Sequence, residues 1–186
     1  MTLIVIGVLL WALVHLIPAA APDLRGTLLG RLGEGGYKGL FSLAILLSIV
    51  LIVLGWRGTV PEAVYNPPYG LRTVSIGLMV IAFILIGASN QPVRIRHWVR
   101  HPQLTGVALW AFAHLLSNGD NKSLVLFGGL LLWALVEIPL ISRREGEWQK
   151  PEVQGWSRDI GGVVIALGIM LLFVWAHPWI AGVPVR

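Results

Sequence analysis

The chain has 186 residues, of which 56% are hydrophobic and only 12% are charged, and its mean hydropathy is +0.77. Soluble domains usually carry about twice that share of charged residues, so this composition excludes an ordinary soluble fold. The absence of cysteine excludes disulfides, thiolate metal sites and thioether-linked haem, and the net charge of +5 is spread between apolar segments rather than gathered in a nucleic-acid-binding tract.

Six apolar segments, taken in chain order, reach or approach the roughly 20 residues that a helix needs to cross about 30 Å of hydrocarbon. They cover residues 3–21, 37–56, 69–88, 102–117, 123–141 and 160–176. Pro and Gly residues mark the gaps, and the short gap after the fourth segment predicts a helical hairpin with the fifth. We therefore expect one all-α domain over residues 1–186, a polytopic integral membrane bundle of about six transmembrane helices.

The basic residues orient the predicted bundle. Ten of the 14 Lys and Arg residues lie in or beside the first, third and fifth loops, and the others are Arg57, Arg72, Lys122 and Arg186. By the positive-inside rule both termini are expected outside the cytoplasm. Residues 18–21 resemble a signal-peptide cleavage site, but no Lys or Arg precedes Asp23, so we expect the first segment to remain as a helix.

Two histidines lie inside predicted spans. His15 lies within the first segment, and His114 lies near the non-cytoplasmic end of the fourth. Imidazole in hydrocarbon needs a partner, because unmatched polar nitrogens cost several kcal/mol. Either each is a neutral histidine bonded to a neighbouring helix, or the pair supplies axial ligands to haem iron. With upright helices, the two residues differ in depth by roughly 12 Å, which is a difficulty for joint ligation.

The segment from Arg100 to Gly106 enters the fourth span. Pro102 suits a first helical turn, and Arg100 and His101 either anchor the interface or bind an anion such as a cofactor carboxylate or a phosphate head group. His101 and His114 are about 220° apart around a helix, so they do not share one metal. Glu137, in the fifth span, is expected to pair with an Arg of a cytoplasmic loop.

These residues resemble a known family. The resemblance rests on Arg100-His101-Pro102-Gln103, Gly106, Trp110, Ala113-His114-Leu115 and Asn118-Gly119-Asp120. They are similar to motifs of the NnrU family, bacterial membrane proteins associated with nitrite and nitric oxide metabolism. The resemblance implies a multi-pass protein of the bacterial inner membrane with a role in denitrification.

That family is in turn similar to the zeta-carotene isomerases, which are haem b proteins. Their two haem-ligand histidines match His15 and His114, and another functionally implicated histidine matches His101. The resemblance thus implies a non-covalent haem b with His15 and His114 on the iron, and His101 as a catalytic candidate. Arg100, from its charge and position, is the further candidate contact to the cofactor. The implied partners are the lipid bilayer, haem, and either nitric oxide or an apolar small molecule.

The chain differs from the motifs of two related enzyme families, and these differences bear on the alternative functions. Nineteen residues after His114 the isomerases carry a His-His pair, where this chain has Trp133-Ala134, which puts carotenoid isomerisation in doubt. Arg-His-Pro also resembles the cofactor region of the isoprenylcysteine carboxyl methyltransferases, which use S-adenosylmethionine, but Leu104 stands at their usual Tyr position. A haem isomerase and a membrane methyltransferase are therefore the alternative functions, and a purely structural bundle is the remaining one.

Overall fold

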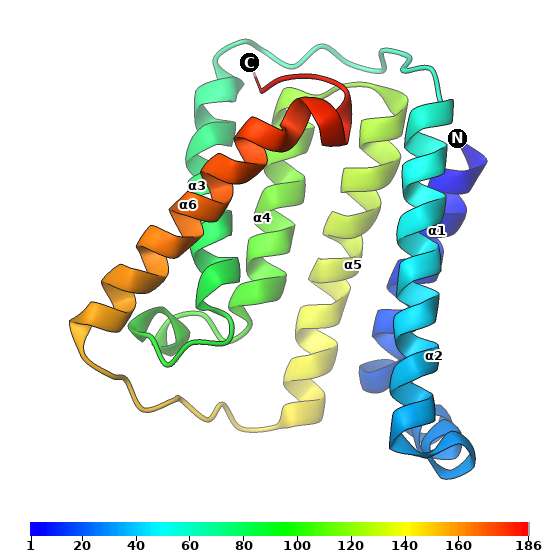
Figure 1. Cartoon of the computed structure of the whole chain (residues 1–186), viewed down its shortest axis with the longest axis vertical. Helices are drawn as coiled ribbons and strands as arrows, with labels where there is room; N and C mark the ends of the chain where they lie inside the picture. The colour runs from blue at the N-terminus through cyan, green and yellow to red at the C-terminus, as the bar shows by residue number, and fades with distance from the viewer. Residues whose placement is uncertain (186) are drawn as a thin grey trace.

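The computed structural model describes residues 1–185, and this part of the chain forms six α-helices and one short 3-10 helix without any β-strand (Figure 1). The helices are α1 (Thr2–Ala20), α2 (Pro22–Gly58), α3 (Leu71–Ala88), η1 (Arg94–His97), α4 (Pro102–Ser117), α5 (Asn121–Glu145) and α6 (Trp156–Ala181). The predicted all-α membrane bundle is confirmed. All the α-helices except α4 are long and apolar enough to cross a membrane. The 16 residues of α4 give it a length of only about 24 Å.

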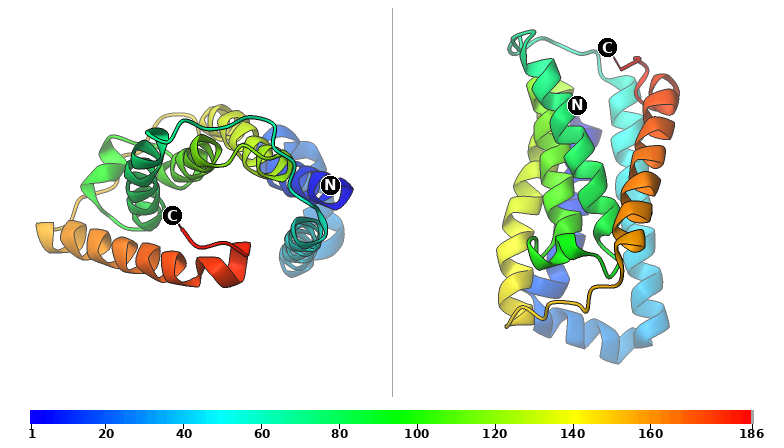
Figure 2. Two further views of the ribbon diagram at one scale, coloured as in Figure 1. Left: turned by 90° about the horizontal axis from the view of Figure 1, so that it is seen from above. Right: turned by 90° about the vertical axis from the view of Figure 1, so that its left-hand side faces the viewer.

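The helices form a curved wall. Seen from above, α3, α4, α5, α1 and α2 follow one another around an arc, and α6 lies across its open side against α3 (Figure 2). The N-terminus and the last turn of α6 lie at one end of the bundle, which we call the terminal end (Figure 1). The loops that carry most Lys and Arg residues gather at the opposite end, which we call the basic end. Its assignment to the cytoplasm stays a prediction.

Glycines let neighbouring helices of the wall touch through their backbones. A Cβ atom on Gly7 of α1 would lie 2.8 Å from the carbonyl oxygen of Ser48 in α2. A Cβ atom on Gly106 of α4 would lie 2.8 Å from the carbonyl oxygen of Ala82 in α3. Small residues at such crossings are typical of membrane helix pairs, which associate by close packing rather than by the hydrophobic effect.

Helix α2 is bent near the basic end. Gly33 has φ 69° and ψ 172°, a conformation that side-chain-bearing residues avoid, and it separates residues 22–32 from the long apolar part of the helix. The first part lies across the basic end, and the second rises through the bundle (Figure 2). The predicted second span, residues 37–56, falls within the rising part.

Residues 59–70, which we call the strap, cross the terminal end between α2 and α3 (Figure 1). The backbone N–H groups of Val64 and Tyr65 donate to the carbonyl of Gly119 at 2.8 and 3.0 Å, and Asn121 N donates to the Glu62 carbonyl at 2.9 Å. A Cβ atom on Gly119 would lie 1.9 Å from the Tyr65 carbonyl oxygen. The predicted α4–α5 hairpin is thus confirmed, and its turn is fastened to the strap.

Candidate cofactor site

His15 is held by its own helix. Its Nδ1 lies 2.9 Å from the carbonyl oxygen of Trp11, one turn earlier in α1. A carbonyl oxygen only accepts, so Nδ1 carries the proton and Nε2 keeps the free lone pair. Within residues 1–185, Nε2 makes no hydrogen bond. Of the two interpretations left open by the sequence, the bond to a neighbouring helix is therefore absent, since Nδ1 bonds to a carbonyl of its own helix.

An aromatic cluster surrounds the His15 ring. Ring-centroid distances are 4.3 Å to Trp11 of α1, 5.0 Å to Trp133 of α5 and 5.4 Å to Phe41 of α2. Tyr37 extends the cluster, at 6.4 Å from Phe41. Three helices thus fix the orientation of the imidazole, and an apolar aromatic surface flanks it.

His114 repeats this arrangement on α4. Its Nδ1 lies 2.9 Å from the carbonyl oxygen of Trp110, so Nε2 is again the nitrogen with the free lone pair. The ring stacks on Phe127 of α5 at 4.2 Å and 22°, and it lies 4.7 Å from Trp110. Metal-ligating histidines almost always donate their other N–H to a carbonyl or carboxylate, and both histidines here do so.

Helix α5 contacts both imidazoles at different heights. Phe127 and Trp133, the residues that touch His114 and His15, are six positions apart, or about 9 Å along the helix. Helices α1 and α4 run in opposite directions (Figure 1), and each imidazole bonds back toward the start of its own helix. The two side chains therefore lean toward each other along the bundle axis. This lean reduces the depth offset expected from the main-chain positions.

Several buried polar atoms beside His15 lack a partner. Among the described residues, Trp11 Nε1, Trp133 Nε1 and Tyr37 Oη are buried without a hydrogen bond. Buried donors in folded proteins are nearly always paired with protein, water or ligand. The aromatic cluster therefore offers three hydrogen-bond donors to a group with oxygen acceptors.

Glu137 lies one turn beyond Trp133 on α5 and is only 3% exposed. Its carboxyl group makes no ion pair or hydrogen bond with any residue in the described range, so the expected pairing with a loop Arg is wrong. The Trp133 N–H is a neighbouring donor, but the two groups do not reach hydrogen-bond geometry. Arg144 is close enough to attract the carboxyl electrostatically, but it does not come within ion-pair distance.

Arg100 and His101 tie the start of α4 to the end of α5. Arg100 Nη2 donates to the Gly146 carbonyl at 2.7 Å and lies 3.8 Å from Glu145, while His101 Nε2 is hydrogen-bonded to Ser142 Oγ at 2.9 Å. Burial lowers the pKa of His101, Arg100 lowers it further, and Glu145 opposes them. The helix begins at Pro102, as predicted.

These two residues are not brought together with the membrane histidines. His101 and His114 lie at opposite ends of α4, about 20 Å apart along the axis. The proposed cofactor contact at Arg100 and the catalytic role of His101 remain predictions, and the visible role of both residues is to connect two helices.

The aromatic rings around the two membrane histidines have a signature in the sequence. Trp-Ala-x-x-His occurs at residues 11–15 and 110–114, and Trp-Ala-Leu-Val-Glu occurs at residues 133–137. In the two histidine copies, the Trp four residues earlier supplies both the carbonyl for Nδ1 and a ring against the imidazole. In the third copy, Glu137 stands at the position of the histidines.

Fold and site together define a polytopic helical membrane protein with two histidines in aromatic cages on separate helices. The family model described as NnrU protein matches residues 3–185. The chain therefore belongs to the NnrU family, and the resemblance seen in its motifs is confirmed. No curated protein and no solved structure matches the chain.

Proposed function

We propose that this NnrU-family protein binds haem b in the bacterial inner membrane, with His15 and His114 as axial ligands, and serves nitrite and nitric oxide metabolism. The observation that carries the proposal is the shared geometry of the two imidazoles. In each, the Nδ1–H donates a hydrogen bond to the backbone carbonyl four residues earlier in the same helix. Nε2 therefore keeps its lone pair free for a metal. The link to nitrogen oxides rests only on what the resemblance to the NnrU family implies.

The ligand set suits haem better than a bare metal ion. Within residues 1–185, no three His, Asp or Glu side chains gather into a possible metal site. A bare zinc or iron ion usually takes three or more protein ligands, whereas haem brings four nitrogens of its own and needs at most two. Two imidazoles with free Nε2 atoms would therefore be enough to hold haem.

The surroundings of His15 also suit this group. The rings of Trp11, Phe41 and Trp133 offer an apolar aromatic surface for a flat macrocycle. The unpaired donors Trp11 Nε1, Trp133 Nε1 and Tyr37 Oη offer hydrogen bonds to carboxylate oxygens such as those of haem propionates. These donors would otherwise each cost on the order of 1–3 kcal/mol.

When bound, haem would supply an iron whose affinity for imidazole depends on its redox state and on nitric oxide. The chain's contribution is to hold each imidazole in one tautomer and one orientation. Three helices hold His15, whereas only α4 and α5 contribute rings to His114. Release of one histidine on a change of redox state would open the site to a gas ligand.

The test is an absorption spectrum of the purified protein, oxidised and dithionite-reduced, with a pyridine haemochrome assay. We expect a six-coordinate haem b spectrum in the wild type that is lost in His15→Ala and in His114→Ala. His97→Ala is the matched control, because His97 bonds to the Pro151 carbonyl at the basic end. Circular dichroism and size-exclusion chromatography establish that each variant is folded.

Two results would contradict the proposal. One is a wild-type protein that takes up no haem on reconstitution under reducing conditions. The other is haem retention in both membrane-histidine variants. For the nitric oxide role, the contrary result is a reduced protein that keeps both histidines and shows no spectral change with nitric oxide.

The alternatives find less support in the contacts. Trp133, at the position of the isomerases' His pair, packs against His15. This indolyl group supplies no second imidazole for isomerase chemistry. Arg100 and His101 are bonded to the end of α5, which leaves fewer of their polar atoms for S-adenosylmethionine. Adenosylmethionine binding is the next assay if no haem is found.

A further inference from the structure

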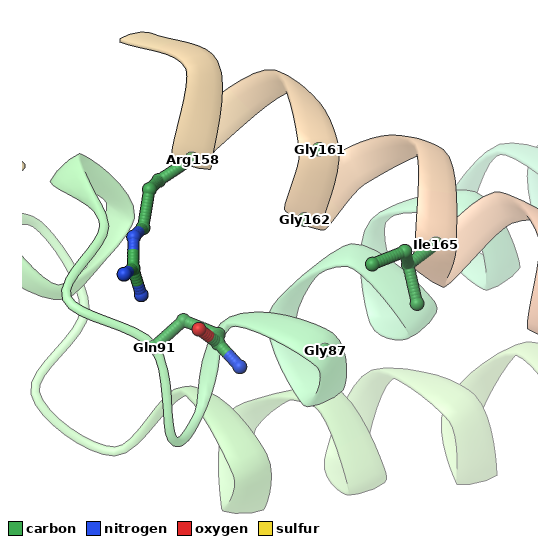
Figure 3. Close-up of a pocket in the computed structure, with 6 residues that line it drawn as sticks. All are labelled: Gly87, Gln91, Arg158, Gly161, Gly162 and Ile165. Atoms are coloured by element: carbon green, nitrogen blue, oxygen red, sulfur yellow. The ribbon is translucent and has the colours of Figure 1, made fainter. Parts of the chain in front are cut away.

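Two adjoining hollows lie between α3 and α6 at the basic end, away from both membrane histidines. They measure about 220 and 200 Å³ and share Gln91 and Gly162 in their walls. The first is lined by Gly87, Gln91, Arg158, Gly161, Gly162 and Ile165 (Figure 3). The second adds the indole rings of Trp98 and Trp156.

One side of the first hollow carries an uncompensated positive charge. Arg158, in the first turn of α6, makes no side-chain hydrogen bond or ion pair with any described residue. Its guanidinium extends from α6 toward Gln91, and the two polar side chains flank the hollow (Figure 3). The nearby Arg94 is different, because Asp159 neutralises it and it stacks over Trp156 at 3.8 Å. Arg158 is thus the charge in this wall that is free for an anion.

The other side of the hollow is apolar and open to the bilayer. A Cβ atom on Gly161 or Gly162 would meet no atom within 4 Å, so the helix surface there is flat and uncovered. Ile165 continues this surface away from the basic end and is 65% exposed. Trp98 and Trp156 are 78% and 67% exposed, and indoles commonly lie at the head-group level of a membrane.

We propose that the hollow binds one anionic phospholipid from the leaflet at the basic end. The phosphate accepts hydrogen bonds from the Arg158 guanidinium and the Gln91 amide, and an acyl chain lies over Gly161, Gly162 and Ile165. Arginine favours phosphate because its planar fork donates two parallel hydrogen bonds. Basic pockets between membrane helices on the cytoplasmic side are known to bind such head groups.

Charge and shape together identify the occupant. An unpaired arginine favours a net negative head group, such as phosphatidylglycerol, over zwitterionic phosphatidylcholine. The apolar floor favours a lipid over free phosphate, since free phosphate gains nothing from Gly161, Gly162 and Ile165. The site is independent of haem, because neither histidine nor any residue of the aromatic cluster lines it.

The experiment is native mass spectrometry of the full chain in detergent, titrated with phosphatidylglycerol or with phosphatidylcholine. We expect one phosphatidylglycerol to bind about tenfold more tightly than phosphatidylcholine, which corresponds to about 1.4 kcal/mol. Arg158→Gln should remove this preference. Arg143→Gln is the matched control, an exposed arginine at the same end that does not line the hollow, and it should retain the preference.

A second variant tests the apolar floor. Gly162→Leu places a side chain in the hollow, and its Cβ position has no atom within 4 Å. It should weaken phosphatidylglycerol binding, and size-exclusion chromatography checks that the protein stays folded. Equal binding of the two lipids, or equal effects of Arg158→Gln and Arg143→Gln, would overturn the proposal. Competition by inorganic phosphate at the same concentration as the lipid would show a simple anion site and would overturn it too.

Discussion

The wall of α1–α5 and the outer helix α6 are attached in different ways. In the wall, helices approach until backbone meets backbone, as at Gly7 against Ser48. Helix α6 has 26 residues, of which only Ala166 is buried. Its attachment rests on a few points: the Arg94–Asp159 ion pair, the approach of Ala166 to Gly87, and a hydrogen bond of 3.3 Å from Trp56 to the Ala181 carbonyl. The wall can therefore hold the histidines rigidly, while α6 can adjust to what lies beside it.

The largest expected effect is that of filling a helix crossing in the wall. Gly7→Val places side-chain atoms against the backbone of α2, where a Cβ alone is 2.8 Å from a carbonyl oxygen. We expect the free energy of unfolding to fall by more than about 4 kcal/mol. The variant should then give little or no monodisperse protein in fluorescence-detected size-exclusion chromatography. Gly168→Val on α6 is the control, because its Cβ position has no neighbour within 4 Å. Equal losses in both variants would contradict the distinction between wall and α6.

The next largest effect is expected at the contact between Arg94 and Asp159, which holds the start of α6. The Asp159 carboxylate accepts from Arg94 N at 2.8 Å and pairs with the Arg94 guanidinium. Asp159→Ala should lower the free energy that holds the start of α6 in place by about 2 kcal/mol. Amide hydrogen exchange should then accelerate in the first turns of α6, while α1–α5 stay protected. Glu152→Ala, at an exposed position, is the control. Acceleration across all helices would show that α6 is an integral part of the wall.

A smaller effect, of the opposite sign, is expected at Glu137. This carboxyl group is buried in the wall with no partner in the described part of the chain, so it must either bury a charge or take up a proton, and Glu137→Gln removes that cost. We expect the free energy of unfolding to rise by about 1 kcal/mol, measured as a higher midpoint of thermal unfolding. Glu147→Gln, which changes an exposed carboxylate, should leave the midpoint unchanged. A large loss in Glu137→Gln would show that the carboxylate has a bound partner.

The smallest expected effect is a pH dependence at His101. Burial and Arg100 lower its pKa in the folded protein, so the unfolded chain binds its proton more readily. Stability should then fall as the pH drops below about 6.5, the ordinary histidine pKa. We expect the thermal midpoint to fall between pH 7.5 and pH 5 by more in the wild type than in His101→Gln. The same fall in both proteins would assign the pH dependence to other groups.

Much of the fold was predictable because the bilayer imposes it. Apolar runs long enough to cross hydrocarbon had to be helices, and each predicted span lies within or close to an observed one. Pro102 at the start of α4 and the turn before Asn121 were also foreseen, since both depend on local backbone chemistry. These features need no knowledge of which helices touch.

What was missed depends on contacts between distant residues. The strap is fastened to Gly119 by hydrogen bonds that no local pattern reveals. The sequence left each membrane histidine either a partner on a neighbouring helix or an iron, and it did not reveal that Nδ1 of both bonds to a carbonyl of its own helix. The isolation of Glu137 could not be read from the nearby arginines, because its orientation on α5 is set by packing. The histidines themselves were found because polar side chains are rare in hydrocarbon.

The strap also imposes an order on assembly. It leaves the ribosome directly after α2, but the groups that bond to it, at Gly119 and Asn121, are made some fifty residues later. The α1–α2 pair can therefore insert and pack early, while its connection to α3 stays unfastened until the α4–α5 turn has emerged. Because His114 precedes that turn on α4, both histidines are already synthesised when the strap can close the terminal end. Fastening of the strap therefore indicates that both membrane histidines have been made, whereas Phe127 and Trp133, which pack against them, follow on α5.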